Sequence, residues 1–180
     1  LYLGLHDEAG ERFSGLQHHP QVAARALTGQ GVVALYSGDI DRSESLFRQA
    51  SALEPEYARP RVALGAVAYL REDYEQAASL YEANRAFLPQ GEQAWSWGSH
   101  ALNNLGWAYI MLGRFEEADR VFGELQHYSS RQYPEPLVGL GWARLMLDDK
   151  RTARKYFEQA LLISPGNDSA LRGQTLSYRL

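Results

Sequence analysis

The 180-residue chain contains no cysteine, which excludes disulfide frameworks, thiolate metal sites and cysteine nucleophiles. It also has no excess of positive charge, since 18 basic and 22 acidic residues give a formal net charge of −4. Nucleic-acid binding needs a basic face, so we expect neither nucleic-acid nor membrane-surface binding. The longest apolar stretches, such as residues 66–70, are far shorter than the roughly 20 residues that span a bilayer. We therefore expect no direct membrane insertion.

Aromatic residues and glycines recur along the chain at one common interval. Large aromatic residues stand 34, 34, 41 and 35 residues apart, a small residue precedes each by four positions, and glycines follow matching steps. The aromatic residues are Phe13, Phe47, Tyr81, Phe122 and Phe157, and the glycines are Gly31, Gly65, Gly106 and Gly141. Independent residue classes that share one period indicate a repeated structural unit.

Each of these markers has a physical reason to recur in a helical unit. A glycine inside a helix costs about 1 kcal/mol in helix propensity, so a periodic glycine indicates a close approach of two helices. A small residue and an aromatic residue four positions apart share one helix face. Apolar positions follow helical spacing, and no segment shows convincing strand alternation. The sequence therefore predicts pairs of α-helices joined by short turns, at residues 37–39, 71–73, 113–114 and 148–149.

Two segments carry the fullest sets of markers. One runs from Gly38 through Phe47 to Pro55, and the other runs from Leu105-Gly106-Trp107-Ala108-Tyr109 through Gly113 and Ala118 to Phe122. Their order of residues resembles the tetratricopeptide repeat. The resemblance implies an all-α fold, an α-α superhelix of antiparallel helix pairs that forms a single solenoid. Its expected parts are a partial repeat at 1–21, full repeats at 22–55, 56–89, 90–132 and 133–166, and a terminal helix at 167–180.

The third repeat departs from the family because it is seven residues too long, and the extra residues lie within 90–101. Glu92, Gln93 and Ala94 favour helix, so the first helix of this repeat is expected to begin early and to be about two turns longer. A loop that ends at Gly98 is the alternative.

In this family the first helix of each repeat lines a concave groove, so the resemblance also implies a binding site. The residues carried over by register, with Trp97 added by helical spacing, are Arg25, Val32, Leu35, Arg59, Tyr69, Trp97, His100, Asn103, Asn104, Trp107, Ile110, Trp142 and Leu145. Thr28, Val62 and Val138 belong to the same register, and Met111 extends the stripe of Trp107. The alternative interpretation is that Trp107 and Trp142 only fill the core.

The leading functional hypothesis is a scaffold that binds another protein, either a helix or an extended peptide, in this groove. Some family members grip a C-terminal carboxylate with Lys, Asn and Arg. At the matching positions here only Asn104 suits that chemistry, so we do not expect tail binding of that kind.

A second hypothesis is a structural spacer or a self-associating segment of a longer array, such as the periplasmic part of a bacterial exopolysaccharide-export protein. The arginine-rich basic composition, with only two lysines, is in keeping with a bacterial source. The sequence does not decide between periplasm and cytoplasm.

A catalytic site would need converging polar groups, and the sequence predicts no catalytic residue, metal or cofactor. Residues 29–34 fit the pattern G-x-G-x-x-A, but no strand precedes them, as nucleotide binding through this pattern requires. His18 and His19 are adjacent, so their side chains point apart, and no further metal ligands lie near them in sequence.

Overall fold

The computed structural model describes residues 22–88, 97–128 and 133–178, and these ranges fold into nine α-helices, α2 to α10, and one 3-10 helix, without a strand. The all-α fold class expected from the sequence is therefore confirmed. The partial repeat expected at 1–21 lies outside the described residues. So does the stretch at 90–96, where the third repeat was expected to begin its long helix.

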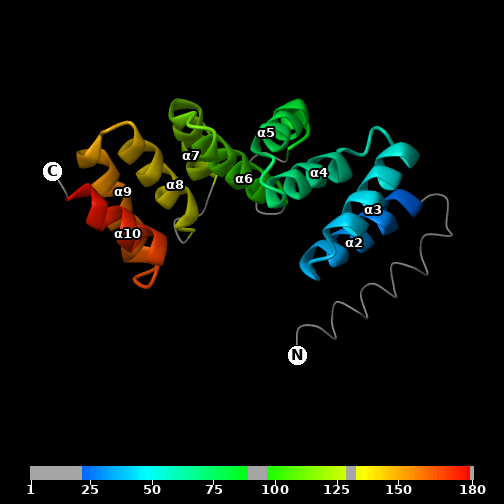
Figure 1. Cartoon of the computed structure of the whole chain (residues 1–180), viewed down its shortest axis with the longest axis horizontal. Helices are drawn as coiled ribbons and strands as arrows, with labels where there is room; N and C mark the ends of the chain where they lie inside the picture. Colours follow the sequence, from blue (N-terminus) through cyan, green and yellow to red (C-terminus); the bar gives the residue numbers. More distant parts are fainter. Residues whose placement is uncertain (1–21, 89–96, 129–132, 179–180) are drawn as a thin grey trace. The chain divides into compact units, whose positions relative to one another are not determined.

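The helices form two compact units, divided after Phe87, and each is described by itself. Unit 1 contains α2 (Ala23–Tyr36), α3 (Ile40–Leu53), α4 (Ala58–Leu70), α5 (Tyr74–Ala83) and the 3-10 helix η1 (Arg85–Phe87). Each α-helix packs against the next one along the chain, and α2 also contacts α4. Figure 1 shows the pairing of α2 with α3.

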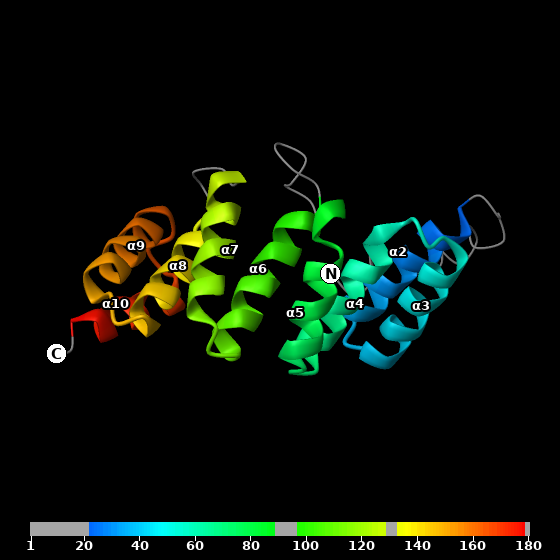
Figure 2. The same cartoon turned by 90° about the horizontal axis from the view of Figure 1, so that it is seen from above.

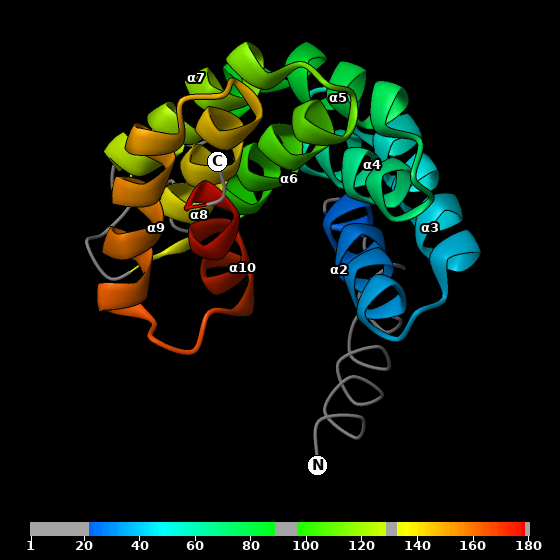
Figure 3. The ribbon, with the colours of Figure 1, turned by 60° about the vertical axis from the view of Figure 1, so that its left-hand side comes forward.

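Unit 2 contains α6 (Trp97–Met111), α7 (Phe115–Tyr128), α8 (Glu135–Met146), α9 (Lys150–Ile163) and α10 (Asp168–Ser177). The neighbours α6 and α7 run side by side (Figure 2). The helix α8 contacts α6 and α10 as well as α7 and α9, and Figure 3 shows α10 beside α8 and α9. We call the surface of α6, α8 and α10 the first-helix face of unit 2. The repeat boundaries inferred from the sequence remain predictions.

Among the described residues the periodic aromatic rings, those of Phe47, Tyr81, Phe122 and Phe157, are fully buried, and each lies directly against a glycine of the preceding helix. A Cβ atom added at Gly31 would come within 2.5 Å of the Phe47 ring, and one at Gly65 within 2.8 Å of the Tyr81 ring. The recurring glycines therefore exist because two helices approach too closely for any side chain at that point. This explains the period in the sequence as a packing requirement.

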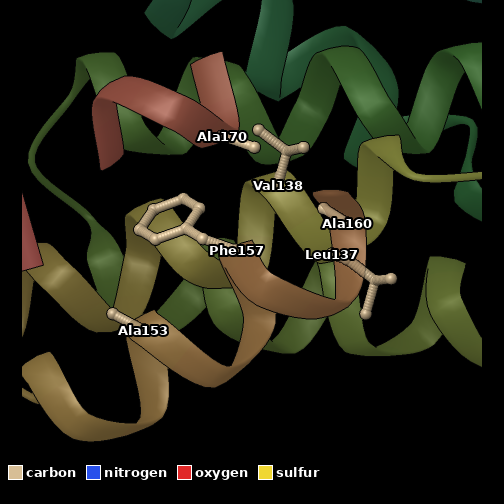
Figure 4. Packing of buried hydrophobic residues seen from close by; sticks show 6 residues of the cluster. All are labelled: Leu137, Val138, Ala153, Phe157, Ala160 and Ala170. Carbon is tan, nitrogen blue, oxygen red and sulfur yellow. The ribbon is translucent and has the colours of Figure 1, made fainter. Parts of the chain in front are cut away.

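In unit 2 each ring is enclosed by glycines from two helices. Phe157 of α9 lies against Gly141 of α8 and Gly173 of α10, where an added Cβ would come within 2.5 Å and 2.2 Å of the ring. Figure 4 shows Phe157 in one cluster with Val138 of α8 and Ala170 of α10. Phe122 of α7 is enclosed in the same way by Gly106 and Gly139.

The turns between paired helices lie where the sequence predicted them, and each contains one residue with positive φ. Gly38 and Gly113 adopt φ values of 80° and 72°, but the other two turns use Glu72 and Asp148 with φ values of 62° and 60°. After three of these four turns an aspartate caps the following helix. The side chains of Asp39, Asp73 and Asp149 accept hydrogen bonds from the backbone N–H groups of Arg42, Gln76 and Thr152.

Replacing Asp149 with alanine is expected to lower the midpoint of thermal unfolding by a few degrees, because one N–H group of α9 loses its acceptor. Hydrogen bonds from the Thr152 side chain and, after it, from the Thr152 backbone N–H lower the pKa of Asp149 below its ordinary value. Since the pKa is lower in the folded state, this stabilisation is present above the ordinary pKa and is lost as the pH falls through the folded pKa. Thermal unfolding from neutral to acidic pH measures both effects.

The matched control is Asp149→Asn, which keeps an acceptor oxygen but does not titrate. It should retain most of the stability and show a weaker acid dependence than the wild type. Equal acid dependence in the wild type and in Asp149→Asn would contradict this role for the carboxylate.

Candidate functional site

Unit 1 contains five of the predicted groove residues. Arg25 and Arg59 are exposed, and Val32, Leu35 and Tyr69 are partly buried. The guanidinium of Arg25 lies 5.9 Å from the centre of the Tyr57 ring. The ring of Tyr69 packs edge-on against that of Tyr74, with centroids 5.5 Å apart. Burial, and to a lesser extent Tyr74, raises the pKa of Tyr69.

Unit 2 contains the other eight predicted residues. His100 is exposed, whereas Asn103, Asn104, Trp107, Ile110, Trp142 and Leu145 are partly buried. The remaining residue, Trp97, begins α6, and its side chain lies outside the described part of the chain. All of these residues come from the first helices α6 and α8, as their register predicted.

Three residues of the same register do not belong to an accessible surface. Thr28, Val62 and Val138 are only 2%, 4% and 3% exposed. The Thr28 hydroxyl donates a hydrogen bond to the Ala24 carbonyl at 2.7 Å, within α2. The expectation that these three positions line a groove is therefore wrong, because their side chains are enclosed within the helix packing.

Trp107 and Trp142 occupy equivalent positions, each directly after a ring-contacting glycine. Trp107 packs edge-on against Phe122 with ring centroids 5.5 Å apart, and Trp142 packs in the same way against Phe157 at 5.8 Å. The indole N–H of Trp142 also donates a hydrogen bond to the Ser169 hydroxyl of α10 at 2.9 Å. Both indoles are thus held by the core and remain only partly buried.

The two methionines of the chain also occupy equivalent positions. Met111 ends α6 and is 57% exposed, and Met146 ends α8 and is 45% exposed. Each follows a tryptophan by four residues, which places it on the same face of its helix. We call Trp107, Met111, Trp142 and Met146 the Trp–Met surface. Sequence reasoning missed Met146, although its spacing of 35 residues from Met111 could have revealed it.

Two side-chain oxygen atoms on the first helices of unit 2 are buried without a hydrogen-bond partner in the described part of the chain. The side-chain oxygens Asn103 Oδ1 of α6 and Glu135 Oε2 of α8 have no hydrogen-bond donor among the described residues. Glu135 is the first residue of α8. Burial, and after it the charge of Glu135, raises the pKa of Tyr133.

Within 22–88, 97–128 and 133–178, no three His, Asp or Glu side chains gather in the arrangement of a metal site. None of the helices in these ranges is long and apolar enough to cross a membrane. The segment at 29–34 that fits G-x-G-x-x-A lies inside α2, and its second glycine, Gly31, contacts Phe47.

Helix pairs in which a buried aromatic ring of one helix packs against a glycine of its neighbour, repeated along the chain, define a helical repeat protein. Family models of the tetratricopeptide repeat match residues 28–92, 99–124 and 137–166. The chain belongs to the tetratricopeptide repeat family. A comparison with curated proteins finds no match.

Solved structures with the same fold cover most of the chain. YrrB, described as a TPR protein with an unusual peptide-binding site, is 15% identical with a TM-score of 0.77, over 94% of this chain and 84% of YrrB. The second TPR domain of human RPAP3, in complex with the HSP70 peptide SGPTIEEVD, is 21% identical with a TM-score of 0.57, over 67% and 93%. The Cut9–Hcn1 structure gives 19% identity and a TM-score of 0.81 over 98% of this chain, which spans 33% of that one. At these identities the likeness shows the fold.

Proposed function

We propose that the chain is a protein-interaction scaffold and that its unit 2 binds a helix or an extended segment of a partner along the Trp–Met surface. The main support for this proposal is that α6 and α8 each have a tryptophan followed four residues later by a methionine. The solved TPR structures that hold HSP70 and HSP90 peptides support the general class of function. The binding of a segment in this place is our proposal.

The packing of the two indoles suits them to act as anchors for a partner. Because Phe122 and Phe157 fix Trp107 and Trp142 from behind, little side-chain entropy is lost when a partner covers their exposed parts. Partly exposed aromatic side chains beside hydrogen-bonding groups are typical centres of binding energy. A complete aromatic side chain buries about 150–250 Å², so each partly exposed indole can contribute a share of that area.

The methionines add an adaptable apolar area at one end of the same helices. Methionine is unbranched and polarisable, so it can adjust to different apolar partners. Met111 and Met146 are exposed by 57% and 45%, and they are not needed to fill the core. They are therefore better test positions than Trp107, whose truncation to alanine would also remove its contact with Phe122.

The double substitution Met111→Glu and Met146→Glu is expected to weaken a peptide that binds this surface by at least about tenfold, which is about 1.4 kcal/mol. Peptides would first be selected on the wild-type chain from a displayed library of random sequences. Fluorescence anisotropy would then measure their affinity for the wild type and for the variant. Both introduced carboxylates would have to be desolvated beneath an apolar contact, which is the reason for the loss.

Leu162→Glu is the matched control, because Leu162 is 85% exposed on α9, a second helix of unit 2. It introduces the same charge and should change the affinity by less than about twofold. Circular dichroism should show unchanged helix content in all variants. Equal affinities for the wild type and the double variant would show that the Trp–Met surface is not the binding site.

The same experiment addresses self-association, the alternative function. Light scattering of the wild type at increasing concentration measures whether copies of the chain associate. If the mass rises with concentration and the double variant abolishes the rise, the surface joins copies of this chain and the foreign-partner proposal fails.

A further inference from the structure

The helix pair of α4 and α5 has two polar side chains at positions that are apolar in the other helix pairs. The position four residues before the ring-contacting glycine is Arg61 in α4, and in the other first helices it is Leu27, Leu102 or Leu137. The position three residues after the buried ring is Asn84, directly after α5, and its equivalents are Ala50, Leu125 and Ala160. All six apolar equivalents are at most 7% exposed. The ordinary packing of a helix pair therefore does not require a polar pair here.

The two polar side chains are held in a fixed arrangement with the ring of Phe87 from η1. Asn84 is only 4% exposed, and its side-chain N–H donates a hydrogen bond to the Leu80 carbonyl at 2.8 Å. Its Oδ1 accepts a hydrogen bond from the Nε–H of Arg61 at 2.9 Å. The guanidinium lies over the Phe87 ring, 5.5 Å from its centroid. We call Arg61, Asn84 and Phe87 the Arg61 site.

The Arg61 guanidinium keeps unused donors in this arrangement. Its Nε–H is bonded to Asn84, whereas the N–H groups of Nη1 and Nη2 have no acceptor in the described part of the chain. Glu82 of α5 forms an ion pair with Arg85 instead, at 2.8 Å. The site is also open to solvent, because Arg61 is only partly buried and Phe87 is 50% exposed. A group from outside can therefore reach a guanidinium that is already oriented.

The first helices of unit 1 carry charge of one sign. Their charged residues are Arg25 on α2 and Arg59 and Arg61 on α4, and neither helix contains an acidic residue. Glu54 and Glu56 precede α4, but neither forms an ion pair with these arginines in residues 22–88. Because like charges add over distances of about 8–10 Å at moderate salt, Arg59 strengthens the attraction of an anion to Arg61.

We propose that the Arg61 site binds the side-chain carboxylate of an aspartate or a glutamate from a partner segment. The planar fork of a guanidinium matches the two oxygens of a carboxylate. Asn84 and Phe87 fix the guanidinium in advance, so that little side-chain entropy is lost on binding. The exposed part of the Phe87 ring offers an apolar contact to the methylene groups that carry the carboxylate. The inference goes beyond the proposed function, because it assigns a second binding site with its own ligand chemistry to unit 1.

The double substitution Arg61→Leu and Asn84→Ala separates binding from folding. It restores the residue types that stand at these positions in α2 and α3, and in α8 and α9. Replacing both partners of a buried hydrogen bond by apolar groups is close to neutral or stabilising. The melting temperature of this variant should therefore equal or exceed that of the wild type. A clear fall would mean that the polar pair has a structural role, and it would overturn the proposal.

Peptides for the binding test come from a displayed library of random sequences. Sequences that bind the Arg61→Leu/Asn84→Ala variant are removed first, and the remaining ones are selected on the wild-type chain. The selected peptides are synthesised with amidated C-termini, so that only side-chain carboxylates can bind. Each is expected to contain an aspartate or a glutamate whose change to the matching amide weakens binding at least about tenfold, measured by fluorescence anisotropy.

The single variant Arg61→Gln tests the direct pairing. It should weaken the acidic peptide by a similar factor and have little effect on the amide version of that peptide, as a double-mutant cycle requires. Arg42→Gln is the matched control, since Arg42 is an exposed arginine on α3 and its change removes the same charge from unit 1. It should alter the affinity by less than about twofold.

The possible outcomes distinguish this site from the Trp–Met surface. The Arg61 site is wrong if no peptide survives the removal step, if the surviving peptides need no acidic residue, or if Arg42→Gln weakens them as much as Arg61→Gln does. Peptides that depend on the Arg61 site should bind the Met111→Glu/Met146→Glu variant as well as they bind the wild type. Since the two sites use different residues in different units, either proposal can fail while the other stands.

Discussion

Replacing Phe157 with alanine is expected to lower the free energy of unfolding of unit 2 by about 3–5 kcal/mol, the usual cost of truncating a buried aromatic ring. Phe157 is 0% exposed and lies between glycines of α8 and α10. Backbones on both sides of the ring limit how far the structure can collapse into the cavity. Urea denaturation followed by circular dichroism would measure the change.

Leu162→Ala is the control for Phe157→Ala. Leu162 is on the same helix but is 85% exposed, so its truncation should change the free energy of unfolding by no more than about 0.5 kcal/mol. A loss below about 1 kcal/mol for Phe157→Ala would contradict the packing of the ring between α8 and α10.

Gly141→Ala is expected to destabilise unit 2 by about 1–3 kcal/mol, the range for overpacking a well-filled core. An added Cβ would come within 2.5 Å of the Phe157 ring, which cannot retreat because Gly173 lies close to it as well. The result is notable because alanine in a helix interior is otherwise better than glycine by about 1 kcal/mol. Chemical denaturation would show the sign directly.

Gly123→Ala provides the matched comparison with the opposite expected sign. Gly123 also lies inside a helix, α7, but apart from its chain neighbours and the backbone of its own helix no atom lies within 4 Å of the position that its Cβ would take. We expect this variant to be more stable by up to about 1 kcal/mol. In the background of Phe157→Ala the penalty of Gly141→Ala should largely disappear, since the ring that it meets is absent. Destabilisation that persists there would have to come from another contact.

The fold was predictable from the sequence because its contacts repeat at a fixed interval. The pairing of Gly31 with Phe47, and of Gly141 with Phe157, requires each residue type at its place, so the period records the packing directly. The turns were equally visible, even where Glu72 stands at a position that elsewhere uses glycine. These features are local in sequence, and a short motif is enough to identify them.

The candidate site was predictable only in outline. Register places Trp107 and Thr28 on first helices, but it does not measure depth, and the structure buries Thr28 while leaving Trp107 partly exposed. The unpaired oxygen of Glu135 could not be foreseen either, because the absence of a partner depends on every helix that packs around it. Whether a buried polar atom finds a hydrogen-bond partner depends on the assembled structure and cannot be seen in a short motif.

The two glycines of α8 have a consequence for how unit 2 comes apart. Gly139 contacts the Phe122 ring of α7 and Gly141 contacts the Phe157 ring of α9, so one helix of 12 residues makes both contacts. A helix this short with two glycines has little tendency to form alone, and it depends on both neighbouring rings at once. Heating should therefore melt α7, α8 and α9 together in one cooperative step, instead of letting the repeats fray one after another from an end.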